Sequence, residues 1–275
     1  MNYFDAVVLG IVEGLTEFLP ISSTGHLTIA EKALGLDLAD PAVTAYTAVI
    51  QMGAIAAVVV YFFGDITRIA KAWALGLVKP EYRGQRDHRM GWYVIVGSIP
   101  VGLVGFLARD LIRGELRSLW FVAGGLIVWS GVMWFAERVA RQDRAERDLG
   151  MRDAIFVGLF QCFSLVAGVS RSGATISAGL LRGLDRVTAT KLSFYLSIPA
   201  LVAAGLFSLK DLSGSTISVG HVAVGTTVSF LVAYAAIAWL LRFVAHHSIG
   251  WFVPYRLALG FGLVALLATG TMSAT

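Results

Sequence analysis

Charged residues and cysteines are both scarce in this chain of 275 residues. Only 15% of the residues are charged, whereas soluble domains carry roughly 25%. The single cysteine, Cys162, excludes an internal disulfide and has no second thiolate with which to hold a metal. The N-terminus lacks a basic stretch ahead of an apolar core, so we expect no cleavable signal peptide. The shortage of charge argues against a soluble domain.

Long apolar runs take the place of the missing charge. Hydrophobic residues make up 57% of the chain, and the mean hydropathy is +0.74. A bilayer core of about 30 Å needs roughly 20 helical residues to cross it. The longest runs lie at about 43–63, 92–107, 119–135, 219–241 and 251–267. The sequence therefore predicts an all-α polytopic membrane protein surrounded by membrane lipids.

The basic residues gather in two segments between these runs. The first segment contains Arg68, Lys71, Lys79, Arg83, Arg86 and Arg89, and the second contains Arg138, Arg141, Arg144, Arg147 and Arg152. By the positive-inside rule, both segments are expected to face the cytoplasm. Membrane topology thus explains the net charge of +4, and we predict no binding of nucleic acid.

Two stretches of the chain are similar to one another at a constant offset of 148 residues, without a gap. The offset aligns Gly10 with Gly158, Ser22 with Ser170, Thr24 with Ser172 and Gly25 with Gly173. Each stretch reads as an apolar helix, a break and a second helix. Broken backbone at membrane depth is tolerated only where protein or a water-filled cavity surrounds it. We therefore predict two re-entrant helical hairpins, at 2–36 and 152–184.

The order of these elements predicts the architecture. Each hairpin would be followed by three transmembrane helices, and an odd number of crossings sends the second hairpin in from the opposite face. This is an inverted-topology repeat, in which two broken helices meet near the membrane midplane. The prediction is a single membrane domain, 1–275, with repeat one at about 1–136 and repeat two at about 153–275. A cytoplasmic basic loop at about 137–152 would join them.

The first copy is acidic. Glu13 and Glu17 are four residues apart and share one face of a helix. Burying a charge at bilayer depth costs about 2.5–3.5 kcal/mol even on lenient scales. The pair thus needs a counter-charge, either Arg171 from the other copy or a divalent metal. The alternative is a solvated helix face near the membrane surface.

Hydroxyl groups crowd the break in both copies. The first break contains Ser22, Ser23, Thr24 and Gly25, and the second contains Ser170, Arg171, Ser172 and Gly173, with Thr175 just beyond. Backbone N–H groups at such a turn and helix start favour phosphate, and a guanidinium adds a bidentate grip. The alternative role for a serine here is that of a helix N-cap.

His26 follows the first turn directly. Its ordinary pKa is close to neutrality, so it could act as a nucleophile or as a general acid or base. A hydrogen-bonded structural histidine is the alternative.

Together these motifs resemble a known family. Residues 13–27, EGLTEFLPISSTGHL, and residues 168–175, GVSRSGAT, are similar to the two signatures of the bacterial undecaprenyl-diphosphate phosphatases linked to bacitracin resistance. The chain departs from the family at Ala167, where proline is usual. That change removes no reactive group.

The resemblance implies a multi-pass enzyme of the bacterial cytoplasmic (inner) membrane. It would hydrolyse undecaprenyl diphosphate, a polyprenyl diphosphate lipid, to the undecaprenyl phosphate carrier of cell-wall synthesis, at a site facing the extracytoplasmic side. It also implies a divalent cation, Mg²⁺ or Ca²⁺, held by Glu13 and Glu17. The residues expected to be catalytic are Glu17, Ser23, His26 and Arg171. The substrate would be bound by Ser22, Thr24, Gly25, Ser170, Arg171, Ser172, Gly173 and Thr175.

Three questions stay open at this point. Either His26 or Ser23 could be the nucleophile, and the oligomeric state is undecided, with a homodimer as one option. A lipid flippase or an ion-coupled transporter could use the same inverted-repeat architecture. Transport, however, does not need a cluster of hydroxyls with a histidine.

Overall fold

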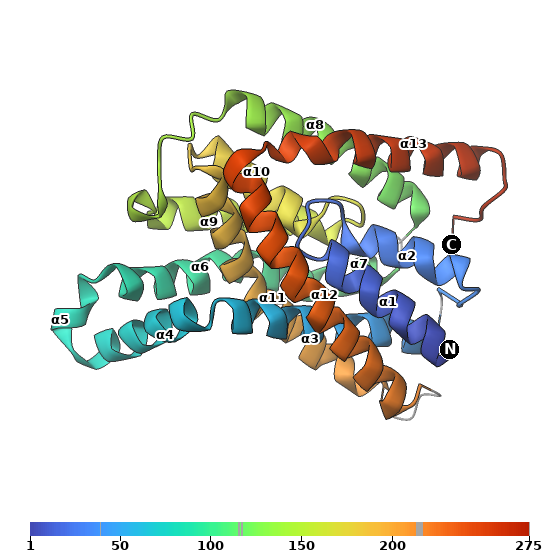
Figure 1. The fold of residues 1–275 in the computed structure, drawn as a ribbon, viewed down its shortest axis with the longest axis horizontal. Helices are drawn as coiled ribbons and strands as arrows, with labels where there is room; N and C mark the ends of the chain where they lie inside the picture. Colours follow the sequence, from blue (N-terminus) through green and yellow to red (C-terminus); the bar gives the residue numbers. More distant parts are fainter. Residues whose placement is uncertain (39, 115, 117, 213–216, 275) are drawn as a thin grey trace.

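Helices make up most of the computed structural model (Figure 1), which describes residues 1–38, 40–114, 116, 118–212 and 217–274. The α-helices are α1 (Tyr3–Thr16), α2 (Ser23–Ala33), α3 (Pro41–Tyr61), α4 (Phe63–Val78), α5 (Pro80–Arg83), α6 (Arg86–Leu107), α7 (Arg109–Arg113), α8 (Leu119–Val139), α9 (Met151–Gln161), α10 (Arg171–Leu181), α11 (Arg186–Leu212), α12 (Val219–His246) and α13 (Val253–Ala268). Short 3₁₀ turns are η2 (Glu146–Asp148), η3 (Cys162–Leu165) and η4 (Ile249–Phe252).

In the described residues, six helical segments are long and apolar enough to cross a membrane. They are α3, α6, α8, the 186–207 part of α11, α12, and η4 with α13. The all-α polytopic prediction is therefore confirmed. The span in α11 was not among the long apolar runs of the sequence, because its apolar residues are interrupted by hydroxyl residues. Two of these, Thr190 and Ser193, are fully buried, so they face other helices.

The first basic segment is more ordered than the loop we expected there. Helix α4 packs against α6, and α5 joins the two at the tip of this hairpin (Figure 1). Trp73 of α4 contacts Gly91, and His88 contacts Gly76. Arg68 forms ion pairs with Asp65 and Asp87 on the exposed side. The small residues Gly76 and Gly91 let the two helices approach closely, so this segment packs as a helical hairpin.

Both predicted helix-break-helix units are present. The first consists of α1, a turn at 17–22 and α2, and the second of α9, η3, a turn and α10. Ser22 and Ser170, which the offset aligns, have left-handed φ angles of 78° and 75°. Such angles cost non-glycine residues free energy and cluster at functional sites. The same unusual backbone therefore recurs at the same place in both copies.

Equivalent glycines place each hairpin against a long helix. In α1, a Cβ added to Gly10 would lie 2.7 Å from the carbonyl oxygen of Gly225 in α12. In α9, a Cβ added to Gly158 would lie 2.0 Å from that of Gly97 in α6. The matching contacts accord with a duplicated architecture. The opposite membrane orientation of the two repeats, and their boundaries, remain predictions.

The Gly158 contact makes a test of this packing. We expect Gly158→Ala to lower the free energy of unfolding by about 1–3 kcal/mol, because α9 must move away from α6 to admit the methyl group. Thermal unfolding in detergent measures the change. The matched control is Gly124→Ala in α8, where an added Cβ meets nothing within 4 Å. Equal stability of the two variants would contradict a tight contact at Gly158.

The second basic segment is tied to the second hairpin through Asp153. This carboxylate is almost fully buried and pairs with Arg144 at 2.6 Å and with Arg182 at 2.8 Å. Burial by itself would raise the pKa of Asp153, but hydrogen bonds from Arg144 and Arg182 outweigh it and hold that pKa below its ordinary value. Arg144 therefore has a structural role in addition to the positive charge by which its segment was expected to face the cytoplasm.

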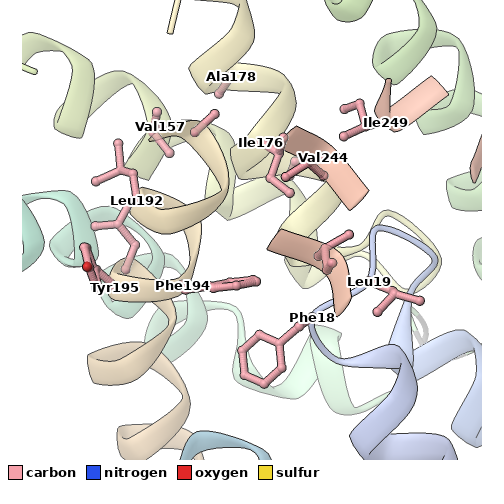
Figure 2. Packing of buried hydrophobic residues seen from close by; sticks show 14 of the residues in the cluster. Phe18, Leu19, Val157, Ile176, Ala178, Leu192, Phe194, Tyr195, Val244 and Ile249 are labelled. Atoms are coloured by element: carbon pink, nitrogen blue, oxygen red, sulfur yellow. The ribbon is translucent and has the colours of Figure 1, made fainter. Parts of the chain in front are cut away.

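The first turn is anchored in the apolar core. Figure 2 shows Phe18 and Leu19 of that turn beside core residues of α9 to α12. The ring of Phe18 meets that of Phe194 edge-on, with centroids 5.0 Å apart. Because Phe18 and Leu19 are buried, the polar residues on either side of them have fixed positions.

Candidate active site

The two turns meet at Glu17 and Arg171. An Nη2 of Arg171 lies 3.0 Å from Oε1 of Glu17, and its Nε lies 3.3 Å from the same oxygen. Both side chains are over 90% buried, with 8% of Arg171 and 3% of Glu17 exposed. Ser172 adds a second link by donating a hydrogen bond of 2.9 Å to the carbonyl of Leu19. The counter-charge that the acidic copy requires thus comes from the basic copy.

The carboxylate of Glu17 has further partners. Its Oε2 accepts a hydrogen bond of 2.6 Å from Ser23 and one of 3.0 Å from the amide of Gln51. With Arg171 on Oε1, both oxygens are engaged. A short bond from a hydroxyl to a carboxylate is the arrangement in which the carboxylate can take the proton of a nucleophile. Glu17 is thus positioned to activate Ser23.

Glu13 lies one helical turn before Glu17, but its carboxylate lacks comparable partners in the described chain. Its side chain is fully buried, and its charged neighbours are Glu17 and Arg171. Gln51 lies beside it, yet neither carboxylate oxygen accepts a hydrogen bond of ordinary geometry from the described residues. A buried carboxylate with unfilled lone pairs fits a cation ligand. No cluster of three or more His, Cys, Asp or Glu that could hold a metal occurs in the described part of the chain.

A cavity of about 720 Å³ contains these groups. Its polar end contains Glu17 and Arg171 with Glu13, Ser22, Ser23, Thr24, Gln51, Gln161 and Ser170, and further polar residues of its lining are Glu31, Thr44, Thr47, Ser98, Arg109 and Ser164. Its apolar walls come from α6, η3 and α11, and include Val101, Phe106, Leu165, Leu201 and Phe207. A polar end in an apolar chamber suits a small anionic group carried on a hydrocarbon chain.

Of the predicted substrate ligands, two serve as helix caps and others lie behind the cavity wall. Ser22 and Ser170 accept hydrogen bonds from the N–H groups of Gly25 and Gly173, so they are N-caps as well as lining residues. Thr175 is fully buried and bonds to Ser193 at 2.7 Å.

Ser172 and the two glycines likewise do not line the cavity. The hydroxyl of Ser172 is occupied by the carbonyl of Leu19. Gly25 lies close to Val122, since an added Cβ would be 3.0 Å from that side chain. Of the predicted site residues, those that line the cavity are therefore Glu13, Glu17, Ser22, Ser23, Thr24, Ser170 and Arg171.

His26 also points away from the cavity. Its Nδ1 lies 2.7 Å from the carbonyl oxygen of Ser22, and its Nε2 lies 2.6 Å from the hydroxyl of Tyr255. The two rings stack with their centroids 5.7 Å apart. Both ring nitrogens are thus occupied by the first turn and α13, which is the arrangement of a structural histidine.

Residues 6–262 match the model of the family described as "Bacitracin resistance protein BacA". The chain belongs to the BacA family. It is 56% identical over 275 residues to "Undecaprenyl-diphosphatase" of Acidothermus cellulolyticus, covering all of both chains. It is 56% identical over 278 residues to "Undecaprenyl-diphosphatase 3" of Frankia casuarinae, again over both full lengths. With "Undecaprenyl-diphosphatase" of Mycolicibacterium smegmatis it shares 50% identity over 279 residues and the full length of both.

These similarities confirm the family that the two motifs indicated. They lend no support to the flippase or transporter alternative, because the relatives carry the name of a phosphatase. A multi-pass membrane protein of a bacterial enzyme family is what both the helices and the comparisons show.

Arg256 and Gln51 are residues of this BacA family site that the sequence analysis did not name, and Arg256 has the larger structural role. It is fully buried in α13, and its guanidinium donates to the carbonyls of Pro20 and Gly168, both at 3.0 Å, and to that of Val169 at 3.2 Å. One side chain thereby holds the first turn and the second turn together. The signal was a lone arginine inside the apolar run 251–267, since charges at that depth are rare and functional.

Proposed function

We propose that this chain hydrolyses undecaprenyl diphosphate to undecaprenyl phosphate and inorganic phosphate, and so recycles the lipid carrier of cell-wall synthesis. The observation that carries the proposal is the group of Glu17, Ser23 and Arg171 at the polar end of a largely apolar cavity. The diphosphate would lie at that end and the isoprenoid chain along the walls. The names of the full-length relatives support the same reaction.

Ser23 is the proposed nucleophile. Its Oγ attacks the terminal phosphorus while its proton passes to Glu17, and the bond from that phosphorus to the bridging oxygen breaks. Undecaprenyl phosphate leaves, and water then hydrolyses the phosphoserine to release inorganic phosphate. Arg171 stabilises the charge that develops on the phosphate oxygens, donating to them from an N–H that does not already bond to Glu17 or Ser193. Glu17 also keeps Arg171 in place.

A divalent cation, Mg²⁺ or Ca²⁺, is the proposed cofactor. It would neutralise phosphate charge and orient the terminal group. Glu13 is its main ligand in this proposal, because its oxygens have capacity to spare, whereas both oxygens of Glu17 are engaged. Glu17 would become a ligand only by giving up one of its partners.

We further propose that the cavity opens to the extracytoplasmic side. Along α6 and α11 the lining residues begin at Ser98 and Pro199, in the halves remote from the basic ends at Arg86 and Arg186. The positive-inside rule puts those basic ends in the cytoplasm. Both halves of the site come from one chain, so catalysis does not require the homodimer that we left as an option.

The proposal is tested with the purified full-length protein in detergent. It should release phosphate from a C15 or C55 isoprenoid diphosphate when Mg²⁺ or Ca²⁺ is present, and chelation should stop the release. Binding of the lipid without any release of phosphate would refute the proposed hydrolase and favour the alternative of a flippase or transporter.

A further inference from the structure

Gln161 is a buried amide at the end of α9 that the site described so far does not use. Its side chain is fully buried and belongs to the wall of the cavity that contains Glu17 and Arg171. Within the described residues, neither its Oε1 nor its Nε2 has a hydrogen-bond partner. An unsatisfied buried polar group costs about 1–3 kcal/mol, so its presence calls for an explanation.

The position of Gln161 in the fold suggests one. The offset of 148 residues aligns it with Glu13, so the two side chains occupy equivalent places in the two hairpins. Both line the cavity, and both lack hydrogen bonds of ordinary geometry to the described chain. At the position of Glu17, by contrast, the second hairpin has the apolar Leu165. An apolar residue would therefore fill the place of Gln161 at lower cost if packing were its only role.

Three of the other polar groups at this end already have partners. Ser23 donates to Glu17, Arg171 is held by Glu17, and Ser170 caps α10. An isoprenoid diphosphate carries many acceptor oxygens, so it can accept from further donors besides these three groups. The amide NH₂ of Gln161 offers two hydrogens.

We propose that Gln161 is a substrate-binding residue whose Nε2 donates a hydrogen bond to an oxygen of the bound diphosphate. The inference rests on the proposed phosphatase function. Since the amide is shielded from solvent, it reaches the anion by rotating about its side-chain torsions. Substrate binding would then provide the hydrogen bond that this buried amide lacks within the described chain.

The test is Gln161→Met, which keeps the length of the side chain and removes its polar atoms. A hydrogen bond to a charged group contributes roughly 1.5–3 kcal/mol, so kcat/KM for a C15 diphosphate should fall by about 10- to 150-fold. Thermal stability without substrate should be unchanged or higher, because an unsatisfied group is gone. The matched control is Gln85→Met, at an exposed position in the first basic segment, which should change neither quantity.

A second variant, Gln161→Glu, distinguishes a residue that donates a hydrogen bond to phosphate from one that binds the cation. A carboxylate would repel the diphosphate, so we expect a larger loss than in Gln161→Met at every cation concentration. Retained activity with a lower Mg²⁺ requirement would overturn the proposal in favour of a metal ligand. An unchanged kcat/KM in Gln161→Met, or a loss that merely follows lower stability, would overturn it as well. If the unmodified protein releases no phosphate at all, the proposed function itself fails.

Discussion

Replacing Arg171 by alanine should lower kcat/KM for an isoprenoid diphosphate by about three orders of magnitude. Arginines that stabilise phosphoryl transfer contribute 10³–10⁵ in rate, in rough terms. The guanidinium also bonds to Glu17, so its loss leaves a buried carboxylate without its counter-charge. Breaking such a pair costs about 3–5 kcal/mol, and part of the effect will therefore be on folding. Steady-state phosphate release and thermal unfolding in detergent measure the two parts.

Arg171→Lys separates the two parts. Lysine keeps the positive charge near Glu17 but lacks the planar set of donors with which arginine can meet Glu17, the Ser193 carbonyl and a phosphate oxygen together. We expect its stability to be close to that of the unmodified protein and its activity to stay at least a hundredfold lower. Arg141→Ala, at an exposed arginine of the second basic segment, is the control. Near-normal hydrolysis by Arg171→Ala would refute a site shared between the two hairpins.

Ser23→Ala should abolish turnover almost completely, whereas His26→Ala should retain about a tenth of it or more. Ser23 bonds to Glu17 at 2.6 Å and lines the cavity. The ring of His26 is instead held between Ser22 and Tyr255. Without Ser23 there is no oxygen for Glu17 to deprotonate at that place. Acid quenching with a labelled substrate should trap phosphate on Ser23 in the unmodified protein.

Tyr255→Phe is the companion variant for His26. It removes the hydroxyl that meets Nε2 but keeps the stacked ring, so we expect a modest loss of stability and activity within a fewfold of normal. A phosphohistidine in the quenched protein, or a Ser23→Ala variant that still turns over, would make His26 the nucleophile and show that its ring turns into the cavity.

The motifs predicted the local backbone well because it depends on neighbouring residues. A run of hydroxyl residues after an apolar helix indicated a break followed by a second helix, with an N-cap as the alternative role for its serines. Ser22 and Ser170 adopt that arrangement with nearly the same φ. The local sequence could not predict the hydrogen-bond partner of each hydroxyl, because that partner depends on the helix that packs against it. Thr175 is an example, since its partner Ser193 lies on α11.

The pairing of Glu17 with Arg171 was predicted in part. The cost of isolated charges at membrane depth required a counter-charge for the acidic copy, and the basic copy offered one. Sequence could not say which carboxylate it would meet. In the structure, Arg171 forms an ion pair with Glu17, whereas Glu13 accepts no hydrogen bond of ordinary geometry from the described chain. That difference separates the proposed base from the proposed cation ligand.

The sequence by itself determined that this chain is a helical membrane protein with two broken hairpins and a divided polar site. Apolar run length, charge cost and the repeat register are properties of the chain and need no partner. Only the tertiary structure decided which polar groups face the cavity. It turned His26 toward Tyr255, used Arg256 to join the two turns, and left Gln161 unsatisfied in the wall. The physical reason is that a buried polar side chain takes its role from the partners that surround it, and those partners come from helices far apart in the sequence.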